Sequence, residues 1–253
     1  MDQKQRLLTR LDAIAAAVKR SGHGVALLGL GSVGQELERL DAFSDLDFFV
    51  IAKPGKKQYF LDSLAWLEPI QPVVFSFLNT VDGCKLLFSD AIFCEMAVFE
   101  PDELAEIPYT SARVVWQDKR SKISFPRGNN LPPAPAQPTT IEWLIGEIMS
   151  NLYVGLGRYW RGEKLTAARF IQGHAVDRIL QLAPFIEEPQ TTYKDPFDPD
   201  RRLEHNYPAL ADELPAFIPG YNKSPQAAQA ILIFLERQFS INQPMKDAIM
   251  RLL

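Results

Sequence analysis

The sequence is poor in the residues that cross-link small domains or bind zinc. It has two cysteines, Cys84 and Cys94, too few for a disulfide framework, and we expect both to be buried thiols. Its three histidines, His23, His174 and His205, are too scattered along the chain for the spacing of a zinc site. Neither a disulfide-stapled domain nor a zinc protein is therefore expected.

Long apolar runs and an excess of basic residues are also missing. No apolar run approaches the roughly 18 residues that a membrane span needs, and residues 1–20 lack the apolar core of a signal peptide. The net charge is −4, whereas nucleic-acid-binding proteins usually carry basic excess. These absences predict a cytoplasmic protein with no membrane and no nucleic acid as partner. They leave open whether it is a monomer or a homodimer.

A change of pattern divides the chain. Residues 129–140 are dense in proline and predict a stiff, extended linker. Short strand-like runs precede this stretch, and helical periodicity follows it. We therefore expect an α/β (α+β) protein, with a mixed β-sheet domain over residues 1–128 and a C-terminal helical bundle domain over residues 138–253.

Apolar spacing also predicts the individual elements. Strands are expected at residues 25–28, 48–51, 73–78, 85–88, 91–99 and 112–117. Helices are expected at residues 4–20, 58–68, 141–161, 165–182, 201–214, 225–239 and 245–253. Thr139 and Glu142 fit a capping box at the start of the first helix after the linker.

The most informative stretch is Val25 to Ile51. Its first apolar run ends in the turn Gly29-Leu30-Gly31-Ser32, and Ser44-Asp45-Leu46-Asp47 opens the second run. Residues two apart on a strand point the same way, so Asp45 and Asp47 would share a face beside that turn. Two carboxylates on one face repel each other unless a cation lies between them. Oxygen ligands beside a backbone turn suit Mg²⁺ carried by a nucleotide phosphate.

A third carboxylate lies inside an apolar strand, AIFCEMAVF. Glu95 would share a face with Phe93 and Ala97, and a carboxylate there is costly unless it has a partner. One interpretation is an edge-strand glutamate that faces water. The other is that Glu95 joins Asp45 and Asp47 across the sheet.

The turn itself allows three interpretations. Residues 29–34 fit G-x-G-x-x-G after a strand, the dinucleotide fingerprint, but too few residues follow for a crossover helix before Asp45. A simple helix-capping turn is the second interpretation. The favoured one is that Ser32 and neighbouring backbone N–H groups hold phosphate oxygens at a helix N-terminus.

Gly31-Ser32 followed by Ser44-Asp45-Leu46-Asp47 resembles the signature of the nucleotidyltransferase superfamily, and the two-domain layout is most like that of bacterial aminoglycoside and lincosamide nucleotidyltransferases. The family usually has a glycine four residues after the serine; here that position is Glu36, with Gly34 two residues earlier.

The resemblance implies Mg²⁺-dependent transfer of a nucleoside monophosphate from an NTP, with ATP the expected one, to a hydroxyl of a small molecule such as an aminoglycoside or a lincosamide. Asp45, Asp47 and Glu95 are the implied catalytic and metal-binding residues. The implied nucleotide-binding residues are Gly31, Ser32 and Ser44, together with Arg161 or Lys164 from the helical domain.

Two rival functions remain. D-x-D also occurs in metal-dependent glycosyltransferases, although the glycine-serine turn and Glu95 speak against that class. A regulatory module could bind a nucleotide without catalysis, although a pure binder has no need for three converging carboxylates. The sequence does not identify the acceptor.

Overall fold

The computed structural model describes residues 2–35, 37–107, 112–125, 140–190, 200 and 202–253. The chain forms two compact units, Met1–Pro138 and Thr139–Leu253, and each is described here by itself. The expected linker, residues 129–140, lies outside the described residues apart from Thr140. The domain boundaries expected at residues 128 and 138 lie in the same undescribed stretch.

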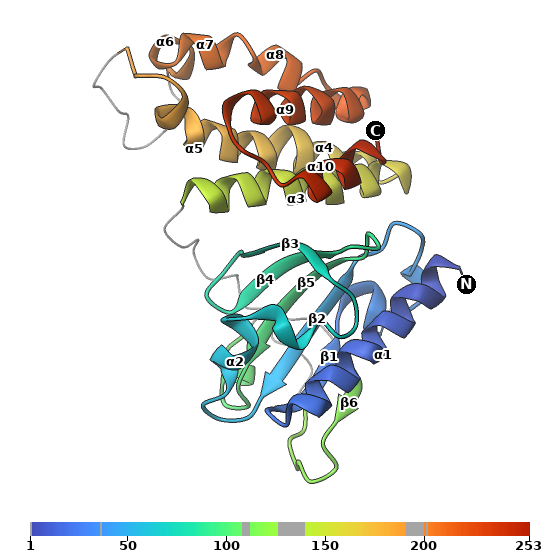
Figure 1. Cartoon of the computed structure of the whole chain (residues 1–253). Helices are drawn as coiled ribbons and strands as arrows, with labels where there is room; N and C mark the ends of the chain where they lie inside the picture. Colours follow the sequence, from blue (N-terminus) through green and yellow to red (C-terminus); the bar gives the residue numbers. More distant parts are fainter. Residues whose placement is uncertain (1, 36, 108–111, 126–139, 191–199, 201) are drawn as a thin grey trace. The chain divides into compact units, whose positions relative to one another are not determined.

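The first unit is built on a mixed six-stranded sheet in the order β3-β4-β5-β2-β1-β6 (Figure 1). Among the strands that the structure describes, β2 and β5 pair in parallel and the other neighbours are antiparallel. The strands are β1 (Gly24–Gly29), β2 (Leu46–Ala52), β3 (Val73–Leu78), β4 (Gly83–Phe88), β5 (Phe93–Phe99) and β6 (Arg113–Gln117). The expected mixed sheet is thus confirmed.

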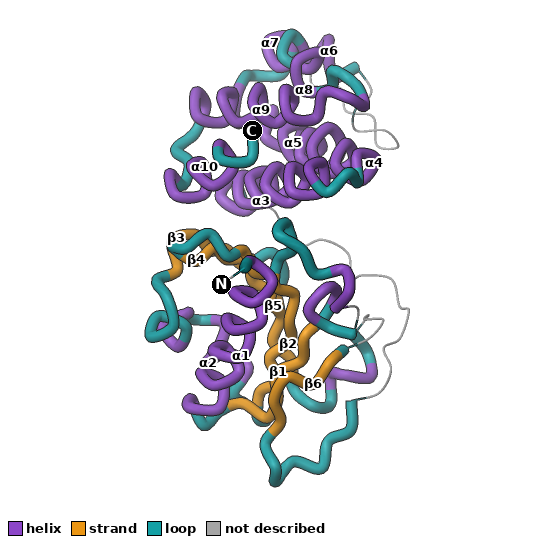
Figure 2. Tube along the Cα trace, turned by 90° about the vertical axis from the view of Figure 1, so that its right-hand side faces the viewer, coloured by secondary structure: helices purple, strands orange, loops and turns teal. Residues whose placement is uncertain are grey.

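Helix α1 (Gln3–Ser21) covers one face of this sheet. Its apolar stripe, which includes Leu7, Leu11 and Ile14, forms one core with alternate strand residues such as Phe48 and Cys94. Helix α2 (Lys57–Leu61) contributes to the same core and lies on the same side as α1 (Figure 2). Neither α1 nor α2 covers the opposite face of the sheet.

A smaller core lies on that opposite face. Val25, Leu28 and Ile51 are buried there, with Phe49 and Ala97 packed against them. Because strand side chains alternate between faces, Asp47 and Glu95, each two residues earlier on its strand, point to this same side. The sheet therefore carries its carboxylates on the face away from α1.

The prediction of one helix over residues 58–68 is wrong. The structure has α2 only to Leu61, followed by a 3₁₀ turn over Leu64–Trp66. Between them Ser63 has extended backbone, and its Oγ accepts a hydrogen bond from the N–H of Ala65 at 3.2 Å. Serine competes for backbone hydrogen bonds in this way, so it favours caps over helix interiors.

The second unit is a helical bundle, as expected. It contains α3 (Ile141–Trp160), α4 (Lys164–Ala168), a π-helical segment (Arg169–Ala175), α5 (Val176–Ile186), α6 (Leu203–Asn206), α7 (Pro208–Ala211), α8 (Leu214–Phe217), α9 (Ser224–Gln238) and α10 (Gln243–Met250). Within the described ranges of both units, no helix combines the length and the apolarity needed to cross a bilayer.

Two expectations for the second unit need correction. Thr140, not Thr139, caps α3, since its Oγ1 accepts from the N–H of Trp143 at 3.1 Å. The helix expected over residues 201–214 is broken into short pieces. Pro208 and Pro215 each lie in the first turn of a new helix, because proline lacks the N–H that a helix interior needs.

Candidate active site

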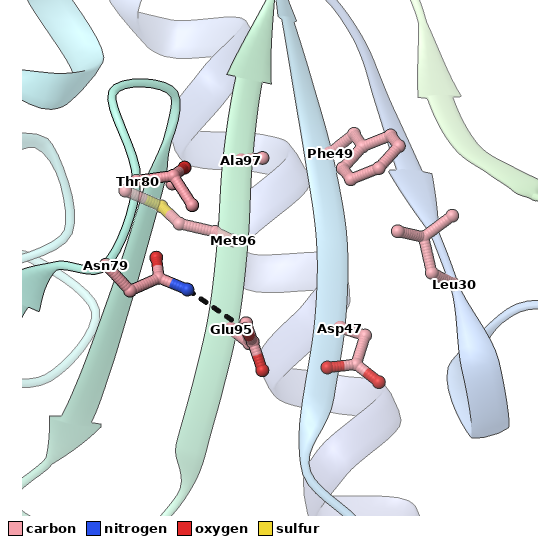
Figure 3. Close-up of a pocket in the computed structure, with 9 residues that line it drawn as sticks. Leu30, Asp47, Phe49, Asn79, Thr80, Glu95, Met96 and Ala97 are labelled. Atoms are coloured by element: carbon pink, nitrogen blue, oxygen red, sulfur yellow. Dashed lines mark hydrogen bonds between the residues drawn. The ribbon is translucent and has the colours of Figure 1, made fainter. Parts of the chain in front are cut away.

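Three charged side chains form a row across the sheet on the face away from α1. Asp47 on β2 pairs directly with Glu95 on β5, and Glu95 pairs directly with Lys85 on β4. Residues that oppose each other on neighbouring strands point to the same face. Figure 3 shows Asp47 and Glu95 beside each other on adjacent strands. We call Lys85, Glu95 and Asp47 the charged row.

Asp45 and Asp47 lie where the chain enters β2. Leu46 and Phe48 are buried, whereas Asp45 and Asp47 are half-buried, the alternation expected of side chains that point to opposite sides. The carbonyl of Asp47 accepts a hydrogen bond from the N–H of Leu30 at 2.8 Å. This bond fixes the end of β1 beside the carboxylates.

The glycine-serine turn is a single 3₁₀ turn over Gly31–Val33. Gly31 has φ +50°, and a Cβ added there would lie 2.9 Å from Oδ2 of Asp47. A Cβ at Gly34 would lie 2.9 Å from the carbonyl carbon of Leu30, so this glycine is also required by close packing. Glu36, where the family usually has glycine, is outside the described residues.

The structure around this turn excludes a dinucleotide-binding fold. In a dinucleotide-binding fold the strand before the fingerprint runs parallel to the next strand, and a full helix connects them. Here β1 and β2 are antiparallel, and the helical pieces described between them are two 3₁₀ turns of three residues. The helix N-terminus that was expected to bind phosphate is therefore only a short 3₁₀ turn. Ser32 is half-buried in that turn.

Replacing Gly31 by alanine should disturb both the turn and the carboxylate beside it. Alanine at positive φ should cost about 1 kcal/mol of unfolding free energy. The new methyl group should also displace the Asp47 carboxylate and lower any metal-dependent turnover by about 10- to 100-fold. Thermal melting and steady-state kinetics measure the two effects.

Gly55 offers a matched control for that variant. It has φ +72°, and a Cβ there would meet nothing within 4 Å. Gly55→Ala should therefore lose similar stability and keep its turnover. If both variants kept full turnover, close contact between Gly31 and Asp47 would have no functional role.

Glu95 has partners on β4 and on the hairpin before it. Its Oε1 accepts a hydrogen bond from Nδ2 of Asn79 at 3.1 Å and lies 4.0 Å from Nζ of Lys85. The interpretation of an edge-strand glutamate is wrong, because β5 lies between β4 and β2 inside the sheet. Glu95 therefore faces Asp47 in the same layer of side chains.

Asp47 and Glu95, but not Asp45, line a cavity of about 400 Å³. Phe49, Met96 and Ala97 give it an apolar wall, and Asn79 and Thr80 line it from the β3–β4 hairpin (Figure 3). A cavity of this volume, mostly apolar with a few polar groups, is typical of small-molecule sites.

Three residues at this site were not identified from the sequence, namely Lys85, Asn79 and Thr80. Lys85 carried the same signal as Glu95, a lone charge inside an otherwise apolar strand, GCKLLF. Asn79 and Thr80 precede a hairpin turn, where polar residues are ordinary, so they carried no signal.

The acidic residues fit magnesium by chemistry, but they do not form a complete site by themselves. Carboxylate oxygens are the ligands that Mg²⁺ prefers. In the part of the chain that the structure describes, no group of three histidine, cysteine, aspartate or glutamate side chains is arranged to hold a metal ion. An ion bound by Asp45 and Asp47 would need further oxygens, such as those of a phosphate.

Both cysteines have pKa values that are raised mainly by burial. Burial raises the pKa of Cys94 well above its ordinary value, the carboxylates of Asp45 and Asp47 raise it further, and Arg10 opposes them. Burial raises the pKa of Cys84 to about 12. Both cysteines are free and buried, as expected.

The remaining expected nucleotide contacts have local roles in the structure. The Oγ of Ser44 accepts from the N–H of Asp41 at 3.0 Å and so shapes the loop that enters β2. In the second unit, Nη1 of Arg161 lies 3.4 Å from Oε1 of Glu163, and Nζ of Lys164 lies 5.5 Å from the centre of the Tyr159 ring. Their contact with a nucleotide stays a prediction.

Comparison with known proteins adds little. No family model and no curated protein matches the chain. Among solved structures, an aminoglycoside 6-adenyltransferase from Bacillus subtilis aligns with 100% of this chain and 92% of its own, at 12% sequence identity and a TM-score of 0.34. A TM-score this low supports no inference about activity.

Proposed function

We propose that this protein transfers a nucleoside monophosphate from an NTP to a hydroxyl of a small molecule. The observation that carries the proposal is the direct pairing of Asp47 with Glu95 on parallel strands, beside the Gly31–Val33 turn and in a cavity of about 400 Å³. Two carboxylates that face each other in a ligand-sized cavity suit a cation and a proton transfer.

Each candidate residue has a proposed role in the reaction. Asp45 and Asp47 would hold Mg²⁺, which supplies positive charge to the phosphates when it is bound. Gly31 and Ser32 lie on the β1 side of Asp47 and would contact phosphate oxygens. Glu95 would accept the proton of the acceptor hydroxyl, whose oxygen bonds to the α-phosphorus as the bond to pyrophosphate breaks.

Several parts of the proposal rest on the sequence resemblance alone. These are ATP as the NTP, an aminoglycoside or lincosamide as acceptor, contact of Ser44 with the nucleotide, and contact of Arg161 or Lys164 with the triphosphate.

Pyrophosphate release tests the proposed function. The protein is incubated with Mg²⁺ and each NTP in turn, against a panel of aminoglycosides, lincosamides and hydroxylated metabolites, with nucleotide-sugars assayed in parallel. We expect acceptor-dependent pyrophosphate release with at least one NTP, abolished by EDTA. Turnover of a nucleotide-sugar alone would indicate a glycosyltransferase, and NTP binding without any release would indicate a regulatory module.

A further inference from the structure

The charged row poses an electrostatic problem when no metal is bound. Asp47 and Glu95 oppose each other on neighbouring strands, and like charges in that position destabilise a sheet. Lys85 is the next residue in the row, with Nζ 4.0 Å from Oε1 of Glu95. Its positive charge offsets part of the repulsion between the two carboxylates.

The surroundings of Lys85 hold its ammonium group in that place. The side chain is only 12% exposed, against 44% for that of Glu95. Its Nζ lies 5.9 Å from the centre of the Phe77 ring on β3. A cation so little exposed is kept close to a carboxylate, because its separation from one costs desolvation energy.

Glu95 is drawn toward the same side. Asn79 and Lys85 both approach its Oε1, from the β3–β4 hairpin and from β4. Asp47 lies on the other side of Glu95, on β2. One oxygen of Glu95 is therefore engaged away from the position between the two carboxylates.

We propose that Lys85 is the resident counter-ion of the Asp47–Glu95 pair and that it weakens the binding of a free divalent cation at Asp47. The metal half of this inference rests on the proposed function. A free ion meets the repulsion of Lys85, whereas an ion that arrives on a nucleotide brings phosphate charges that outweigh it. Lys85 thus makes the site selective for metal already bound to a nucleotide.

Binding of Mn²⁺ alone, without nucleotide, tests the inference. Loss of one nearby positive charge at a partly exposed site should tighten Mn²⁺ binding by about tenfold. Lys85→Met should show this increase, Lys85→Arg should bind as the wild type does, and Lys56→Met, an exposed lysine, is the control. Lys85→Gln replaces Lys85→Met if the latter fails to fold.

A second measurement does not depend on metal. In EDTA, Lys85→Met should lower the melting temperature of the wild-type protein. The same change should lower that of the Glu95→Gln variant by about 2–5 °C less, because Glu95→Gln has already removed one of the two repelling charges. Equal losses in both backgrounds would overturn the counter-ion role.

The two proposals fail in different ways. Unchanged or weaker Mn²⁺ binding in Lys85→Met, with an active wild type, would overturn this inference alone. Absence of NTP turnover and of Mn²⁺ binding in every variant would overturn the proposed function together with the metal half.

Discussion

Replacing Asp47 by asparagine is expected to abolish turnover while leaving the protein folded and at least as stable as the wild type. Asparagine keeps the shape and the backbone bond to Leu30 but removes the charge of the proposed metal ligand. Loss of such an electrostatic contact should lower kcat by about 10³-fold or more. The same change relieves the repulsion with Glu95, so melting in EDTA should be equal or higher.

This opposite response of activity and stability separates a functional carboxylate from a structural one. Asp45→Asn should lose turnover as well, since Asp45 is the other proposed metal ligand. Asp62→Asn, an exposed aspartate outside the cavity, is the matched control and should behave as the wild type. Near-normal turnover in both Asp45→Asn and Asp47→Asn would refute the metal assignment.

Glu95→Gln is expected to slow the chemical step without weakening nucleotide binding. Glutamine keeps the length and can still accept from Asn79, but it cannot take up the hydroxyl proton. A lost general base should cost about 10²–10⁴-fold in single-turnover rate. Because Asp45 and Asp47 are the proposed metal ligands and the phosphates bring most of the negative charge around the ion, the dissociation constant of Mg²⁺-NTP should change little.

A titration and a single-turnover experiment on this variant distinguish the possible roles of Glu95. Weaker Mg²⁺ and nucleotide binding together with slower turnover would make it a metal ligand. No change in either would leave it a structural partner of Asn79 and Lys85. Glu106→Gln, an exposed glutamate in the same unit, is the control.

The strands and the acidic residues could be predicted because each produced a local signal. Short apolar runs mark β1, β2 and β5, and acidic residues such as Asp47 and Glu95 interrupt the runs of β2 and β5. The same reasoning, applied to Lys85, would have found the third member of the charged row. Whether these residues carry the proposed chemistry stays a prediction.

Other features depend on contacts that no local pattern contains. The parallel pairing of β2 with β5 moves Glu95 from a possible edge to the centre of the sheet, and Asn79 gains its role only through that arrangement. The break at Ser63 depends on a side-chain hydrogen bond to Ala65, and the cap at Thr140 lies one residue from the expected one, a difference that is common at helix ends.

The order of the strands also bears on how the protein reaches its native state. Asp47 meets Glu95 only once β5 has paired with β2, a pairing between distant parts of the chain. Such contacts carry a large loop-closure entropy and form slowly. During synthesis on the ribosome, a nascent chain that ends before β5 lacks the partner strand of β2, so the edge of β2 is exposed until residues 93–99 emerge. The sheet unit should therefore fold more slowly than the helical unit. The exposed edge of β2 is where a chaperone would bind the nascent chain.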